Sequence, residues 1–215
     1  MKIIKTFVYG ILAGVSIAIG GTVFLSLDNK VLGALFFTVG LFTVCTFGFN
    51  LFTGKVCYIF ESDWKFGLDL IIIWLGNFLG AWLTGEALRA TRISSISEKA
   101  ISMCQVKLSD SLMSIFILAI FCNILIFIAV DGFRNNPHVP GKYLAIFFGV
   151  TVFILCGFEH SVANMFYITM AGMWSGKSLL FILVNTLGNA VGGVLIPLLR
   201  RCFAKESLTA RIRYS

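Results

Sequence analysis

The sequence predicts an all-α integral membrane protein whose six transmembrane helices form two inverted repeats of three. Of its 215 residues, 58% are hydrophobic and only 13% are charged, whereas a soluble domain carries about 25% charged residues. The charges separate apolar runs that are long enough to cross a bilayer. In addition, short motifs of the first half recur in the second half in the same order, which is typical of transporter repeats.

The recurring motifs define the two halves. They are Gly48-Phe49 with Gly157-Phe158, Tyr58-Ile59 with Tyr167-Ile168, and Leu75–Gly80 with Leu187–Gly192. The first two pairs share one spacing and the third has nearly the same spacing, so a single internal duplication explains all three.

Six apolar runs predict the membrane spans. They extend from about Thr6 to Leu27, Val31 to Phe60, Gly67 to Leu88, Ser111 to Val130, Tyr143 to Trp174, and Ser178 to Leu199. About 20 residues suffice to cross a bilayer, so the second and fifth runs are too long for one straight helix. Gly48 and Gly157 lie inside them, and we expect half-helices joined by irregular backbone there.

The spans and the segments between them organise one transmembrane domain. Its parts are repeat one (about 6–88), a polar connector (89–110), repeat two (about 111–199) and a basic C-terminal tail (200–215). Three crossings per repeat invert the second copy relative to the first. The pore is then expected where the two broken helices meet.

The distribution of charge sets the orientation and excludes one class of partner. Lys and Arg are more numerous in the segments that share a side with the N-terminus, which predicts that both termini are cytoplasmic in a plasma or inner membrane. The net charge of +7 lies mostly in end segments and loops, so no nucleic-acid partner is expected. The six cysteines lack ligand spacing, and neither a disulfide nor a metal is expected. Lys2 and Lys5 precede an apolar run without a cleavage site, which argues against a signal peptide.

Two ionisable residues interrupt the fifth apolar run. Glu159 and His160 stand side by side in the segment Gly-Phe-Glu-His-Ser-Val-Ala-Asn-Met-Phe, residues 157–166. Hydrocarbon penalises both side chains, so protein or water must surround them, and such residues mark functional sites by default. A satisfied core histidine is the alternative.

This segment resembles the signature of the formate/nitrite transporter family. Leu51-Phe52-Thr53, Cys122-Asn123 and Gly188-Asn189 resemble the family's other short motifs and occur in the family's order. The resemblance implies an aquaporin-like fold, a homopentamer in the lipid bilayer, no cofactor, and passage of small inorganic or organic monovalent anions of weak acids through each protomer.

The resemblance also implies roles for individual residues. His160 resembles the central pore histidine, Asn164 the asparagine that orients it, and Thr53 the hydroxyl that faces it. Glu159 resembles the acid that braces the broken helix, and Lys107 the lysine that draws anions toward the pore. Asn123 belongs to one of the family motifs, with helix bridging as the alternative. The expected constriction residues are Phe52, Phe153, Leu41 and Phe37, the last two by spacing alone.

Two departures from the family pattern stand out. Only Met1 to Lys5 precede the first span, so gating by an N-terminal segment, usual in the family, is not expected. Lys55 is an unusual charge beside Thr53. It either reaches water at an interface or adds an anion-attracting group.

Burial favours the neutral form of a weak acid, so we expect transport to follow the availability of protons. Either His160 gives its proton to the anion, or water supplies the proton and His160 is only a polar partner. The sequence leaves both routes open.

Other functions compete with anion passage. An aquaporin-like channel for neutral solutes predicts Asn-Pro-Ala at both broken helices, and the sequence lacks that motif. An intramembrane enzyme is a weaker alternative, because two histidines, one of them in a loop, cannot build the usual metalloprotease or hydrolase constellations. We therefore expect no catalytic site.

Overall fold

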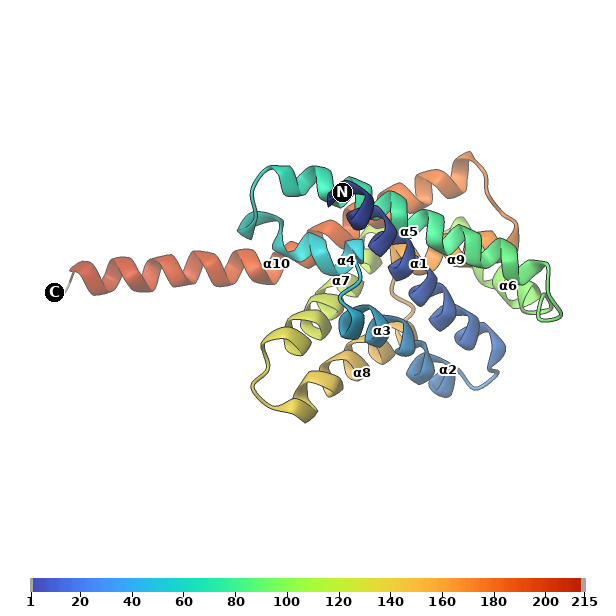
Figure 1. Ribbon diagram of the computed structural model, residues 1–215, viewed down its shortest axis with the longest axis horizontal. Coiled ribbons are helices and arrows are strands. Elements are labelled where there is room, and N and C mark those ends of the chain that lie inside the picture. Colours follow the sequence, from blue (N-terminus) through green and yellow to red (C-terminus); the bar gives the residue numbers. More distant parts are fainter. Residues whose placement is uncertain (1, 214–215) are drawn as a thin grey trace.

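The computed structural model describes the backbone of residues 2–213 and the side chains of residues 2–203, and this part of the chain is almost entirely helical (Figure 1). Its elements are α1 (Lys2–Ser26), α2 (Lys30–Phe37), α3 (Val39–Phe47), α4 (Phe52–Lys55), the 3-10 helix η1 (Val56–Glu61), α5 (Lys65–Arg89), α6 (Ile96–Ser109), α7 (Leu112–Asn135), α8 (Val139–Leu155), α9 (Ser161–Ala171) and α10 (Gly176–Arg213).

Within the described side chains, five helical segments are long and apolar enough to cross a membrane. They are Lys2–Ser26, Lys30–Phe47, Lys65–Arg89, Leu112–Asn135 and Gly176–Phe203. α8 is a shorter apolar helix, and it is followed by the separate helix α9. The expected basic tail from residue 200 begins as a continuation of α10, and its last two residues lie outside the described part of the chain.

Each Gly-Phe pair ends a helix. Gly48 follows α3 with a φ of +67°, and Gly157 follows α8 with a φ of +71°. An L side chain rarely adopts this left-handed conformation, so glycine is strongly favoured at both positions. The chain then runs extended through Leu51 and His160 before α4 and α9 begin.

The two Leu-Gly-Asn motifs bring long helices into close contact. A Cβ atom on Gly80 would collide with the Ile11 carbonyl of α1, and one on Gly192 would collide with the Ile120 carbonyl of α7. α1 therefore packs against α5, as α7 packs against α10. Figure 1 shows α1 crossing beside α5, and the last turns of α10 projecting from the bundle.

The connector contains a helix that the sequence analysis did not anticipate. α6 occupies most of residues 89–110 and packs against α9. Its buried residues are Ile96, Ala100, Cys104 and Leu108, at a four-residue spacing that is typical of one buried helical face. The polar residues between them hid this pattern from a reading based on mean hydropathy.

Candidate functional site

The His160 side chain caps the N-terminus of α9. Its Nδ1 accepts a hydrogen bond from the backbone N–H of Ala163 at 3.1 Å, and its Nε2 lies 3.0 Å from Thr53 Oγ1. A backbone N–H only donates, so Nδ1 carries no hydrogen. The ring is therefore neutral, with its hydrogen on Nε2 directed at the Thr53 hydroxyl. The helix α4 and the N-terminus of α9 thus meet at one buried hydrogen bond.

Aromatic rings pack next to the His160 side of the hydrogen bond between His160 and Thr53. The Phe153 ring stacks on the His160 ring, with centroids 5.6 Å apart and an interplanar angle of 17°. Phe37 meets Phe153 edge to face at 6.0 Å. Phe37, Phe153 and Leu41 are each 1% exposed. Three of the expected constriction residues are thus buried in the same core, and two of them form a continuous row of aromatic contacts with the imidazole.

Glu159 joins three segments by short polar contacts. Its Oε2 accepts from Lys107 Nζ of α6 at 2.6 Å and from Asn164 Nδ2 of α9 at 2.6 Å. The side chains of Glu159 and Lys107 are 6% and 16% exposed. The positive charge of Lys107 is therefore compensated by a buried carboxylate. Lys107 is not a free cation at this cavity.

Asn164 has a different partner from the one expected. Its side-chain amide donates to Glu159 and not to the His160 ring. The ring is held by Ala163 and Thr53 instead. One helical turn does place Asn164 near His160, but the carboxylate beside it is the stronger acceptor.

Two asparagines hold the backbone at the two helix interruptions in the same way. Asn77 accepts from the Phe52 N–H at 2.8 Å, and its amide donates to the carbonyls of Gly10 and Asn50, both at 2.8 Å.

Asn189 accepts from the Ser161 N–H at 2.9 Å and donates to the carbonyls of Ala119 and Glu159 at 2.9 and 2.8 Å. Each side chain therefore makes two hydrogen bonds to the backbone beside an interruption and a third to a carbonyl of a long helix, Gly10 of α1 or Ala119 of α7.

Asn123 supports the half-helix that carries Thr53. Its amide donates to the Thr53 carbonyl at 3.0 Å. Its Oδ1 is buried and lacks a hydrogen-bond partner within the described part of the chain. The contact of Asn123 is with the backbone of α4, so its role in the described geometry is to position Thr53.

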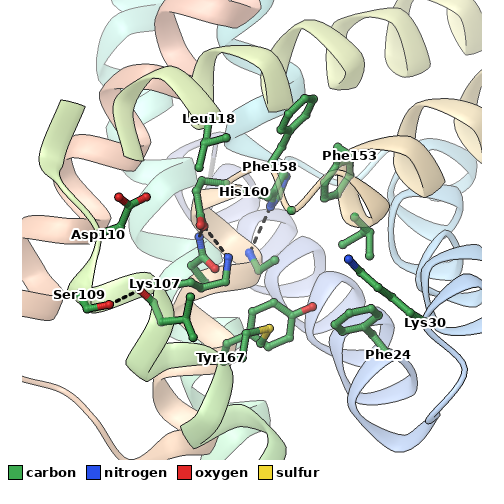
Figure 2. Close-up of a pocket in the computed structure, with 17 residues that line it drawn as sticks. Phe24, Lys30, Lys107, Ser109, Asp110, Leu118, Phe153, Phe158, His160 and Tyr167 are labelled. Atoms are coloured by element: carbon green, nitrogen blue, oxygen red, sulfur yellow. Dashed lines mark hydrogen bonds and ion pairs between the residues drawn. The ribbon is translucent and has the colours of Figure 1, made fainter. Parts of the chain in front are cut away.

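A cavity of about 610 Å³ reaches the His160 ring, and we call it the α9 cavity. Its charged lining residues are Lys30, Lys107, Asp110 and Glu159. Figure 2 shows His160 close to Phe153, with Lys107 on one side of the cavity and Lys30 on the other. Two cations and two carboxylates line this cavity.

A second cavity of about 230 Å³, which we call the α4 cavity, lies beside the other helix interruption. Its lining includes Leu41, Leu51, Lys55 and Arg134. Asp110 and Leu118 place the α9 cavity beside the first turns of α7, whereas Arg134 places the α4 cavity beside its last turn. The two cavities therefore flank opposite ends of α7.

Phe52 lies away from the buried hydrogen bond. It packs with Val56, Leu70 and Ile73 between α5 and the α4–η1 segment, and it lines neither of the two cavities. Leu51, one residue earlier, lines the α4 cavity and is 1% exposed. The extended conformation of Leu51 turns successive side chains in opposite directions, which explains why Leu51 lines this cavity and Phe52 does not.

The spacing of the recurring motifs could have identified Leu51 as a residue that lines the α4 cavity. Its position corresponds to that of His160 at the spacing that separates Gly48 from Gly157. The same spacing relates Phe24 to Phe133 and Tyr58 to Tyr167, which line the two cavities in pairs. Local motifs gave no signal for these residues.

Comparison with known proteins gives a consistent result over nearly the whole chain. The model of the formate/nitrite transporter family matches residues 1–202. The uncharacterized transporter YrhG of Bacillus subtilis is 31% identical over 180 residues, which cover 77% of this chain and 68% of YrhG. The probable formate transporter of Methanothermobacter thermautotrophicus is 30% identical, with 89% and 85% covered.

The formate channel FocA of Haemophilus influenzae is 27% identical, over 77% of this chain and 66% of that protein. The chain thus spans about two thirds of the length of FocA. Among solved structures, a pentameric formate channel with formate bound has a TM-score of 0.79 at 23% identity, over 96% of this chain and 98% of that one. An FNT family ion channel has a TM-score of 0.75 at 24% identity, over 94% and 89%. These likenesses establish the fold.

Proposed function

The chain belongs to the formate/nitrite transporter family, and from this membership we propose that it passes small monovalent anions of weak acids, such as formate, nitrite or hydrosulfide, across the membrane. It is a multi-pass membrane protein. The observation that carries the proposal is the buried, neutral His160, hydrogen-bonded to Thr53 between two cavities at opposite ends of a membrane-spanning helix.

We further propose the architecture that this passage requires. The six spans form two inverted repeats, with the second and fifth spans broken, as in an aquaporin-like channel. The helix ends at Gly48 and Gly157 support the two breaks. The matching pairs α1–α5 and α7–α10, with an asparagine at each interruption, support the repeat.

The proposed passage avoids carrying a bare charge through the core. A carboxylate or nitrite anion in the α9 or α4 cavity takes one proton from water, crosses the rings of Phe153 and Phe37 as the neutral acid, and releases the proton on the other side. One anion and one proton thus move together, and the step is electroneutral. Because a desolvated anion is far more costly than its neutral acid, the apolar rings select the neutral form.

The hydrogen bond from Ala163 supports a particular role for His160. A second proton would sit on Nδ1 and would face the Ala163 N–H at 3.1 Å, at the positive end of α9. We therefore propose that His160 stays neutral and donates a hydrogen bond from Nε2 to the substrate. Water, and not the imidazole, supplies the proton.

The remaining alternatives are an aquaporin-like channel for neutral solutes and an intramembrane enzyme. The relatives named above are channels and transporters, which favours a channel without catalysis. The pentameric formate channel supports a homopentamer. We place the protein in the plasma or inner membrane with both termini cytoplasmic, as the charge distribution indicates.

A flux panel tests the proposal. We expect purified protein in liposomes to accelerate uptake of formate, nitrite or hydrosulfide at least tenfold over empty liposomes, and to leave water and glycerol permeability unchanged. Stopped-flow measurements with each solute, and with lactate as a larger acid, provide the comparison. Glycerol or water flux without any anion flux would favour the neutral-solute channel.

Substitution of His160 separates the two proton routes. In His160→Phe, which keeps the stack on Phe153, we expect formate uptake about two- to twelvefold slower, because a hydrogen bond between a neutral imidazole and a neutral acid contributes about 0.5–1.5 kcal/mol. Uptake should still rise as the pH falls, because the proton joins the substrate. Thr53→Val serves as the companion variant with an intact imidazole. Uptake by His160→Phe that no longer responds to pH would assign the proton to His160.

A further inference from the structure

The charged residues that line the α4 cavity are all cationic. Lys55 and Arg134 line it, and none of its lining residues is a carboxylate. Lys55 is half-buried, and its ammonium forms no ion pair within the described part of the chain. Arg134 lies over the Tyr58 ring, with its guanidinium carbon 4.5 Å from the ring centroid. This cavity therefore carries uncompensated positive charge beside the apolar constriction.

We propose that the α4 cavity is an anion-binding vestibule in which Lys55 and Arg134 concentrate a small monovalent anion before it meets the constriction. That this anion is the transported substrate rests on the proposed function. The anion would serve as the missing partner of the Lys55 ammonium.

The carboxylate that lies close to Arg134 along α7 is already engaged elsewhere. Asp131 lies one turn before Arg134 on α7, but it accepts from Arg200 at 3.0 Å and from Asn135 at 2.7 Å. The Tyr58 hydroxyl also donates to it at 3.4 Å. Asp131 does not line the α4 cavity. It therefore compensates Arg200 and leaves Lys55 without a carboxylate.

The internal repeat shows how the two cavities acquired different charges. Most residues that line the α4 cavity have counterparts that line the α9 cavity at the spacing of the repeat. The pairs are Val44 with Phe153, Cys45 with Ile154, Gly48 with Gly157, Phe49 with Phe158, Leu51 with His160, Gly54 with Ala163, Lys55 with Asn164, and Tyr58 with Tyr167.

Two substitutions between the copies change the electrostatics. Lys55 occupies the position of Asn164, and Asn50 occupies the position of Glu159. In the α9 cavity the carboxylate of Glu159 compensates Lys107 at 2.6 Å. In the first copy the corresponding residue is an amide, which donates to the Thr6 carbonyl at 3.3 Å. The first copy thus gains a cation at one position and lacks an acid at the other.

A cleft lined by one sign of charge raises the local concentration of counter-ions by about 10–1,000-fold. The charges of the α9 cavity are two cations and two carboxylates, so its net attraction for anions is weak. The α4 cavity, whose charged lining residues are both cations, therefore attracts anions more strongly than the α9 cavity. Among the described residues, this assigns to Lys55 the role that the family resemblance implied for Lys107.

The electrostatic potential in each cavity can be compared without a transport assay, from the rates at which charged reagents label an introduced cysteine. Val130→Cys places a probe in the lining of the α4 cavity, and Val106→Cys places a second, more exposed probe in the lining of the α9 cavity. Both are made in a background in which Cys45, Cys156 and Cys202 are replaced by serine. The readout is the ratio of labelling rates by an anionic and a cationic methanethiosulfonate of similar size, on the whole protein in detergent. Because both reagents attack the same thiolate, the ratio cancels differences in thiol reactivity.

We expect the anionic reagent to be favoured at least tenfold more at Val130→Cys than at Val106→Cys. Adding Lys55→Gln should lower the ratio at Val130→Cys at least threefold and leave the ratio at Val106→Cys unchanged. Lys55→Arg should retain the ratio, and Arg134→Gln should lower it if Lys55→Gln fails to fold. Lys142→Gln, which removes one charge just beyond the loop that follows Arg134, is the control. Equal ratios at the two probes, or a ratio at Val130→Cys that Lys55→Gln and Arg134→Gln do not alter, would overturn the proposal.

A flux measurement connects the site to transport. Lys55→Gln should raise the formate concentration for half-maximal flux from the α4 side at least threefold, with a smaller salt dependence. A wild-type protein that moves no anion would contradict the proposed function but not the thiol result. Normal flux with unchanged half-saturation in Lys55→Gln would show instead that the site does not serve transport.

Discussion

Glu159 is the most constrained charged residue of the α9 cavity, because it accepts from Lys107 and Asn164 on two different helices. The pair it forms with Lys107 is largely buried. Removal of one partner of a buried pair leaves an uncompensated charge, whereas removal of both partners is often tolerated. Because Lys107 lies on α6 and Glu159 lies just before α9, the ion pair links the connector helix to the irregular backbone at the start of α9.

We expect Glu159→Gln to destabilise the protein by about 3 kcal/mol, or roughly 6–12 °C in Tm, because Lys107 loses its counter-ion. The double variant Lys107→Met/Glu159→Gln should recover more than half of that loss. Thermal unfolding in detergent measures both. Glu86→Gln breaks an exposed pair with Arg89 and should cost less than about 1 kcal/mol. A double variant no more stable than Glu159→Gln would contradict a charge-based explanation.

At the scale of elements, the short helices α4 and α9 depend on side chains from other helices. α4 has only four residues, so its own backbone hydrogen bonds contribute little stability. Asn77 on α5 and Asn189 on α10 supply the hydrogen bonds that the interruptions lack. The interrupted elements are therefore positioned by the long helices that pack around them.

Replacement of these asparagines tests that dependence. Asn77→Ala and Asn189→Ala each remove three hydrogen bonds and should each cost about 3 kcal/mol or more. Asn185→Ala is a matched control on α10, because Asn185 is fully buried but its amide forms no hydrogen bond within the described residues. Asn185→Ala should lower the free energy of unfolding clearly less than Asn77→Ala or Asn189→Ala does. Thermal unfolding, with formate flux on the surviving protein, measures the effects. Equal losses in all three variants would rule out a special role at the interruptions.

At the scale of the whole molecule, the outer surface carries many exposed apolar side chains. On α5 and α10 they include Ile71, Leu75, Leu83, Leu183 and Leu187. Lipid or a neighbouring subunit must cover such a surface. The proposed homopentamer would divide it between subunit contacts and lipid.

We expect the purified protein to have a protein mass of five times 23.7 kDa in mild detergent. Light scattering coupled to size exclusion, corrected for bound detergent, gives that mass, and native mass spectrometry checks it. Full denaturation in hot dodecyl sulfate should return the single-chain mass. A monomer or a trimer at every protein concentration would contradict the pentamer.

The sequence predicts some elements of the fold better than others. Hydropathy placed the long helices, because burial in hydrocarbon depends on local composition. Predicted spans such as residues 67–88 and 178–199 lie within α5 and α10. The Gly-Phe pairs indicated where helices end, because the left-handed backbone at Gly48 and Gly157 is a local preference for glycine. The boundaries of α6 were missed because its buried face lies among polar residues.

The sequence by itself therefore determined the helical membrane class and the placement of Glu159 and His160 inside an apolar run, which depend on local composition, and it predicted an internal repeat from comparison of the two halves. Only the tertiary structure decided which groups meet. It joined Lys107 to Glu159, directed the Asn164 amide to Glu159, packed Phe52 against Leu70 and Ile73 and left Lys55 beside Arg134 in one cavity. The physical reason is that a polar side chain binds whichever partner packing brings within about 3 Å, and packing joins residues that are distant in the chain.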